Sequence, residues 1–187
     1  MRELYQYVER KEGQVSQEDL AEIKALIDSG IDLNEEDSYI IHSAVTHNHL
    51  EVVELLIKSG ANINTCLSGT FDDCLYLVAD SHTFRAVQYI IDIQSNYKIT
   101  PLHLAILMNN IEMAELLVKL GADVNTPLKL EEYYEEDFDL YVYDPLHLAV
   151  LSKNIEMTEL LLKSGADISS QAIKSSKRME EYYGEVT

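Results

Sequence analysis

The chain has 187 residues and a formal net charge of −19 at pH 7, from 14 Lys and Arg against 33 Asp and Glu. Hydrophobic residues make up 47% of it, which is ordinary for a globular protein and excludes wholesale disorder. Its charge repels phosphates and anionic lipid at long range, so we expect no nucleic-acid partner, no membrane partner and attraction to basic proteins.

No apolar run approaches the roughly 20 residues that span a bilayer, and the first residues lack the apolar stretch of a secretory signal. We therefore expect a cytoplasmic protein. Two cysteines, Cys66 and Cys74, are too few for a disulfide framework, which favours reduced thiols.

Residues 1–34 predict a terminal helical unit. Residues 2–11 predict its first helix, and Ser16 resembles the N-cap of the second, with Asp19 in the first turn. The polar residues Glu22, Lys24 and Asp28 suit the outer face of a capping unit.

A repeated pattern occupies the rest of the chain, and it predicts units at 38–64, 73–96, 100–125 and 144–169. Three of the units share a histidine followed 18 positions later by a glycine, and the unit at 73–96 is a diverged copy that begins near Tyr76. Each unit reads as two short helices, because a broad apolar stripe precedes a glycine suited to a helix C-cap. Asparagines tolerant of the left-handed conformation are expected at the turn between the helices: Asn48, Asn109 and Asn154.

The segments Thr100–Ala105 (TPLHLA) and Asp144–Ala149 (DPLHLA) resemble the ankyrin signature T-P-L-H-x-A, and GADVN at 121–125 resembles the family's following turn. The resemblance covers about residues 16–169. It implies an all-α repeat solenoid of about five helix-turn-helix units, the terminal ones capping, with short β-hairpin fingers along one edge. In such a stack His42, His103 and His147 lie too far apart to share a metal, so we expect them to form hydrogen bonds between turns.

The spacing between units predicts fingers of unequal length. A truncated finger is expected at 94–99 and an extended one at 126–143. Variation of this kind falls on loops because their closure entropy grows slowly with length. Residues 170–187 are expected to form a C-terminal cap or tail, with a short capping helix.

The extended finger interleaves acids with aromatic rings. Three interpretations stay open: a solvated insertion, a segment that partly packs back on the stack, or an interface in which rings supply affinity and acids steer a basic partner. Under the second interpretation the binding residues are Glu131, Glu132, Tyr133, Tyr134, Glu135, Glu136, Asp137, Phe138, Asp139 and Tyr141.

A second candidate surface follows from the family resemblance, in which partners contact the inner helix face. On this chain Leu107, Met108 and Leu151 would form an apolar patch beside the acidic finger. The alternative is that the finger partly covers them.

No catalytic, cofactor or metal motif is present: there is no Gly-rich phosphate loop, G-x-S-x-G elbow, H-E-x-x-H or C-x-x-C. The acids lack the fixed spacing of a calcium loop. We therefore expect no enzyme, no cofactor and no metal.

The predicted function is a protein-binding module that blocks or scaffolds a partner with a basic surface and is a monomer when free. A narrower hypothesis is an inhibitor or immunity-type protein against a nucleic-acid-binding or nuclease partner. A bacterial effector translocated into a host cell would also fit. The alternatives are a homo-oligomeric scaffold and, as a third class, a metal-dependent hydrolase.

Overall fold

The computed structural model describes residues 3–5, 8, 15–34, 39–70, 95–133 and 137–178. Its helices are α2 (Gln17–Asp28), α3 (Ile40–Thr46), α4 (Leu50–Lys58), α7 (Pro101–Leu107), α8 (Ile111–Lys119), α9 (Pro145–Leu151) and α10 (Ile155–Lys163). Its strands are β1 (Leu67–Thr70), β2 (Ser95–Ile99), β3 (Leu128–Tyr133), β4 (Asp137–Tyr143) and β5 (Ile173–Arg178).

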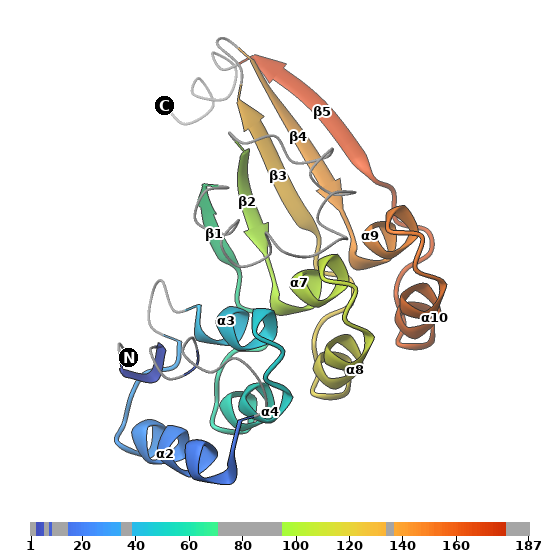
Figure 1. The fold of residues 1–187 in the computed structure, drawn as a ribbon. Helices are drawn as coiled ribbons and strands as arrows, with labels where there is room; N and C mark the ends of the chain where they lie inside the picture. The colour runs from blue at the N-terminus through green and yellow to red at the C-terminus, as the bar shows by residue number, and fades with distance from the viewer. Residues whose placement is uncertain are drawn as a thin grey trace.

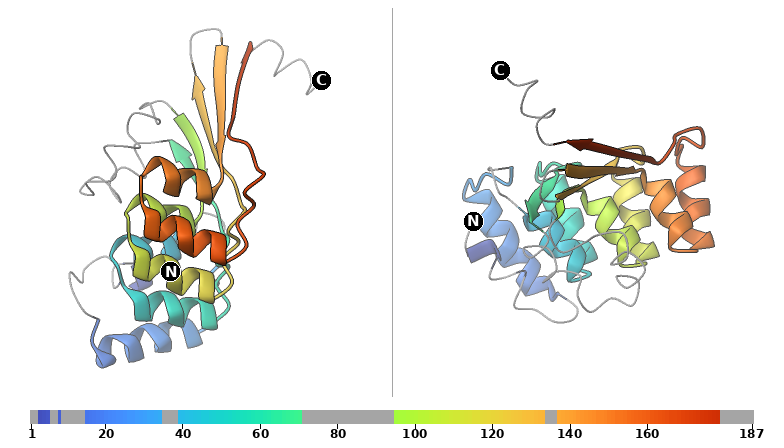
Figure 2. Two further views of the ribbon diagram at one scale, coloured as in Figure 1. Left: turned by 90° about the vertical axis from the view of Figure 1, so that its right-hand side faces the viewer. Right: turned by 90° about the horizontal axis from the view of Figure 1, so that it is seen from above.

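The helices stand in two rows beneath a sheet (Figure 1). The pairs α3/α4, α7/α8 and α9/α10 follow one another along the stack, and α2 lies beside α4. The sheet rises from the row that contains α3, α7 and α9, as the turned views of Figure 2 show. This is the architecture that the sequence pattern predicts, a helical repeat solenoid with strands along one edge.

The fingers of successive repeats join into one sheet, which the sequence analysis did not predict. The strand order is β1-β2-β3-β4-β5, and every neighbouring pair is antiparallel. The extended finger is the hairpin β3–β4. A truncated finger was expected at 94–99, and the structure has the strand β2 there. This strand pairs with β1 on one side and with β3 on the other.

Among the described helices, the pairs α3/α4 and α7/α8 are direct neighbours. Helix α3 packs directly against α7, and α4 against α8. The repeat predicted at 73–96 lies between these two pairs along the sequence, and it stays a prediction. Residues 71–94 lie outside the described residues, and the chain enters them from β1 and leaves them into β2, which pair with each other.

A ladder of asparagines confirms this order of neighbours. The backbone N–H of Asn62 donates to Asn34 Oδ1 at 2.7 Å, and in the next step Asp123 N–H donates to Asn64 Oδ1 at 2.9 Å. Asp167 N–H then donates to Asn125 Oδ1 at 2.8 Å. Each repeat is thus tied to the next one in space.

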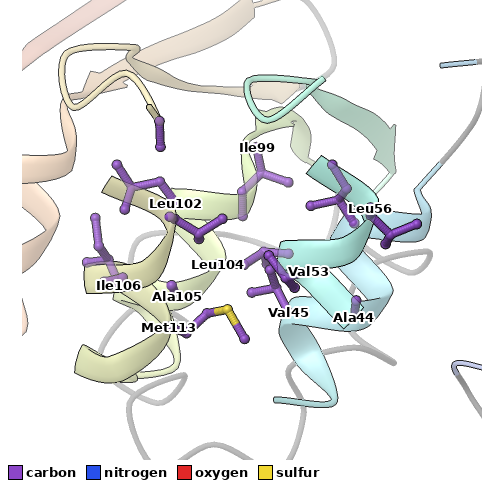
Figure 3. Close-up of a cluster of buried hydrophobic side chains, with 14 of the residues drawn as sticks. Ala44, Val45, Val53, Leu56, Ile99, Leu102, Leu104, Ala105, Ile106 and Met113 are labelled. Carbon is purple, nitrogen blue, oxygen red and sulfur yellow. The ribbon is translucent and has the colours of Figure 1, made fainter. Parts of the chain in front are cut away.

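The core lies between the helix pairs (Figure 3). Val45 and Val53 from one pair lie near Leu104 and Met113 from the next, and all four side chains are buried. The leucines that recur in the second helix of each complete repeat are fully buried, as the apolar stripe predicts: Leu56, Leu117 and Leu161.

Local signals end the helices mostly as expected. Ser16 caps α2 in a capping box with Asp19, and the glycine after each second helix has a positive φ, for example +100° at Gly121. Asn48 and Asn109 are left-handed, both at φ 56°. The expectation for Asn154 is wrong: Lys153 takes the left-handed position, and Asn154 is the N-cap of α10.

The C-terminal prediction also needs correction. Residues 173–178 form the strand β5, where a capping helix was expected. The reason is tertiary, because β4 offers an open edge and the backbone of β5 pairs with it along six residues.

Candidate protein-interaction surface

The acidic finger places its carboxylates on the two strands of one hairpin. The register aligns Glu131 with Leu140 and Glu132 with Asp139. Like charges on directly opposed residues destabilise a strand pair, so the Glu132–Asp139 position is unfavourable for the isolated hairpin. Tyr134, Glu135 and Glu136 of the predicted site lie outside the described residues.

The neighbouring strand β5 brings basic residues to this hairpin. Asp137 lies opposite Arg178, and Phe138 lies opposite Lys177. Sequence reasoning missed this relationship because it assigned the segment to a helix. The available signal was the lysine-rich, polar composition of IKSSKR, which is typical of an edge strand.

The described strands together are close to neutral. They carry four acids and five bases, which are Glu131, Glu132, Asp137 and Asp139 against Lys98, Lys129, Lys174, Lys177 and Arg178. The four acids on the described strands of the finger therefore share one sheet with five basic residues.

Tyr141 joins the hairpin to the helices. Its ring stacks on that of Tyr143, with centroids 6.3 Å apart and planes inclined by 11°. Both rings are half-buried and pack against the core cluster. At Tyr141 the finger therefore packs back on the stack, which was one of the interpretations left open for this segment.

The apolar patch expected on the inner helices does not exist as predicted. Leu107 is only 3% exposed, so it is a core residue and cannot contact a partner. Met108 is half-buried against the core, whereas Leu151 is 48% exposed at the end of α9.

The second helices carry a different acidic surface. Glu51, Glu112 and Glu156 occupy the same position of successive repeats and are all exposed. One turn further along, Glu54 pairs with Lys58 at 2.6 Å, and this lysine lowers the pKa of the carboxyl.

Two signature histidines are buried between repeats. Nε2 of His42 lies 3.0 Å from the carbonyl oxygen of Ile99 in the next unit, which confirms the predicted hydrogen bond between turns. Burial lowers the pKa of His42 to about 4, and that hydrogen bond opposes the shift. Burial likewise lowers the pKa of His103 to about 4, although a hydrogen bond with the backbone of Thr126 acts in the other direction.

Within the described part of the chain, no group of three or more His, Cys, Asp or Glu residues is arranged to hold a metal ion. None of the helices described is long and apolar enough to cross a bilayer. Cys66 is exposed and its thiol is free.

Comparison with known proteins defines the family. The model for ankyrin repeats in three copies matches residues 65–127, and the single ankyrin repeat model matches 39–66 and 143–173. These matches span more than half of the sequence. The chain belongs to the ankyrin repeat family, whose members generally mediate protein–protein interaction and are typically not enzymes.

Similar proteins occur in viruses and bacteria. An ankyrin repeat protein of Acanthamoeba polyphaga mimivirus is 29% identical over 122 residues, which is 64% of this chain and 37% of that protein. One of Rickettsia felis is 30% identical over 120 residues, or 58% of this chain and 39% of that protein. The chain thus spans about two fifths of the length of these relatives.

Among solved structures, the ankyrin repeat domain of Bcl-3 is similar, with 21% identity and a TM-score of 0.38. The match covers 90% of this chain and 73% of that domain. At this score the similarity adds nothing to the assignment, which rests on the repeats themselves.

Proposed function

We propose that this protein is a non-catalytic binding module that captures a partner protein with a basic surface and blocks or scaffolds it. The observation that carries the proposal is the β3–β4 hairpin, which carries acids and aromatic residues on a sheet that packs against the repeats through Tyr141. Acids of this kind steer a basic partner, and aromatic residues anchor it.

The charges around the hairpin narrow the proposed contact. On strand β5, Arg178 lies opposite Asp137 and Lys177 lies opposite Phe138. Strands β4 and β5 therefore suit a basic partner poorly. We therefore propose that the contact centres on Glu131 and Glu132 of β3, which does not pair with β5, and extends to the acids Glu135 and Glu136 of the sequence. The net charge of −19 adds long-range attraction that does not depend on the contact itself.

The test begins with capture of the partner from a lysate of the source organism by the full chain, and its identification by mass spectrometry. Association rates are then measured over a range of salt concentrations for the quadruple variant E131K/E132K/E135K/E136K. We expect association to slow by about tenfold or more at low salt, with a weaker dependence on salt.

A matched control separates the finger from the overall field. The variant E51K/E112K/E115K/E156K changes the net charge equally but alters the second helices, whose side chains are exposed at these positions. It should slow association much less. Equal losses in the two variants, or no loss in either, would contradict the proposed contact.

A narrower form of the proposal is an inhibitor of a nucleic-acid-binding or nuclease partner, in which carboxylates occupy the place of phosphates. Its test is competition: the captured partner should lose affinity for nucleic acid in the presence of the chain, and the quadruple variant should compete less. An immunity-type protein and a translocated effector both fit this form.

A homo-oligomeric scaffold is the second candidate function. One observation favours it, which is that the last helix pair exposes Val150 and Ile155.

A further inference from the structure

The two faces of the sheet have different surroundings. Successive residues of a strand lie on opposite faces, so the register assigns each position to one of them. Ile99, Leu128, Tyr141 and Tyr143 share one face, and all four belong to the hydrophobic core or pack against it. We call this the inner face, and the opposite one the outer face.

A row of four residues crosses the outer face from β2 to β5. Lys98 lies opposite Lys129, Lys129 lies opposite Val142, and Val142 lies opposite Ile173. Both lysines are exposed, Val142 is half-buried and Ile173 is 52% exposed. Leu140, two positions before Val142, is on the same face and is also half-buried. We call these five residues the outer patch.

The apolar part of the outer patch does not serve the core. Within the described part of the chain, the core cluster includes Tyr141 and Tyr143 but neither Leu140 nor Val142. An antiparallel sheet with one face on the core usually turns polar residues to the other face. Adjacent apolar residues on that second face are typical of a surface that contacts another molecule.

The two lysines of the outer patch are held side by side. Directly opposed residues of an antiparallel pair have their Cβ atoms about 5 Å apart, and like charges at that position destabilise the pair. Among the described residues neither Lys98 nor Lys129 has an ion pair, whereas Lys24, Lys58 and Lys163 each pair with an acid on their own helix. A carboxylate placed between Lys98 and Lys129 would remove this repulsion.

Charge separates the two faces of the sheet. By register the outer face holds three bases and one acid, which are Lys98, Lys129, Lys177 and Glu131. The inner face holds three acids and two bases, which are Glu132, Asp137, Asp139, Lys174 and Arg178. Charges beyond about 8 Å are largely screened at physiological salt, so a short segment on the outer face meets mainly its bases. A nucleic acid or a membrane is larger and meets the field of the whole chain, whose net charge is −19.

From these observations we infer that the outer patch is a docking site for an acidic, apolar peptide segment of a partner protein. A carboxylate of the segment lies between Lys98 and Lys129, and its apolar side chains cover Leu140, Val142 and Ile173. A basic segment is disfavoured there because it would add charge of the same sign to the two lysines. This contact has the opposite charge preference to the one under the proposed function, and it does not depend on it.

The test is a selection of short random peptides displayed against the full chain, followed by fluorescence anisotropy with the selected peptides. We expect peptides in which Asp or Glu stands beside Leu, Ile, Val or Phe. The variant K98E/K129E should raise their dissociation constant by at least about tenfold. The matched control K119E/K153E makes the same change of charge at two other exposed lysines and should alter it by less than about twofold.

A second variant tests the apolar part of the site. V142T/I173T keeps β-branched side chains and therefore strand propensity, and it should raise the dissociation constant by about fivefold or more. Circular dichroism establishes that each variant is folded. Binding of the peptide should shift the backbone amide resonances of the outer patch in nuclear magnetic resonance spectra.

Three results would overturn the inference: selection of basic peptides only, equal losses in K98E/K129E and its control, or amide shifts confined to other parts of the chain. Association with the basic partner of the proposed function should be the same for V142T/I173T as for the unaltered protein. The inference and the proposed function can therefore fail separately.

Discussion

The side-chain amide of Asn110 donates a hydrogen bond to Oδ1 of Asn48 at 2.7 Å, although 62 positions separate the two residues. The ankyrin period is about 33 residues, so this separation would suit units that are two repeats apart. The contact instead joins direct neighbours. The additional chain length therefore lies between the paired strands β1 and β2.

Residues 71–95 should be replaceable by Asn-Gly without loss of the fold. The pair Thr70–Asn96 would then be closed by a two-residue turn of the type that suits antiparallel hairpins. We expect the free energy of unfolding in urea, followed by circular dichroism, to change by no more than about 1 kcal/mol. The reason is that closing a shorter connection between β1 and β2 has a smaller entropic cost.

Deletion of residues 100–125 is the contrasting change, since it removes the helix pair that covers Val45 and Val53. This deletion should abolish cooperative unfolding. A loss above about 3 kcal/mol for the Asn-Gly variant, the magnitude of a lost core contact, would show that residues 71–95 are part of the stack.

The substitution Asn110→Ala should destabilise the protein by about 1–2 kcal/mol. Asn110 Oδ1 accepts a hydrogen bond from the backbone N–H of Met113 at 3.0 Å and so caps α8, and its amide also bonds to Asn48. Asn110→Ser keeps a capping oxygen but loses the bond to the neighbouring repeat, so its urea midpoint should be intermediate. Equal stability of Asn110→Ala and Asn110→Ser would assign the whole effect to the bond with Asn48, whereas an Asn110→Ser variant as stable as the unaltered protein would assign it to the cap.

Stability should fall as the pH is lowered from 7 towards 4. The pKa of both His42 and His103 is about 4 in the folded protein, against 6.5 as the ordinary value, so the unfolded chain binds protons first. The stabilisation is complete above pH 6.5 and is lost as the pH falls through the folded pKa.

Urea denaturation between pH 7 and pH 5 measures this effect in a range where carboxylates stay mostly ionised. The slope should reach at most about 1.4 kcal/mol per pH unit for each histidine. The variant His42→Gln should reduce the slope, and the double variant H42Q/H103Q should reduce it further. Identical slopes in all three proteins would rule out the buried histidines as its source.

The substitution Leu117→Ala should cost about 2–5 kcal/mol, because this side chain is fully buried between repeats and its removal leaves a cavity. Glu115→Ala on the same helix alters an exposed side chain and should change the free energy of unfolding by less than about 0.5 kcal/mol. Thermal and urea denaturation would check both values. A small effect at Leu117 would contradict the packing of α8 against its neighbours.

Much of the site could not be foreseen from the order of residues. The acids and rings of the finger are visible in the sequence, but Leu107 reads as a surface residue until its neighbours are placed around it. Arg178 reads as part of a polar tail until β5 pairs with β4 and brings it opposite Asp137. These relationships depend on segments that are distant along the chain.

The helices themselves were readable in advance, because their apolar spacing, the capping Ser16 and the glycine at 121 act within a few residues of where they stand. The sequence did not show which helix pairs are neighbours. It also did not show that the fingers join into one sheet. Those outcomes arise from contacts between segments that are distant along the chain, which the local spacing of apolar residues does not encode.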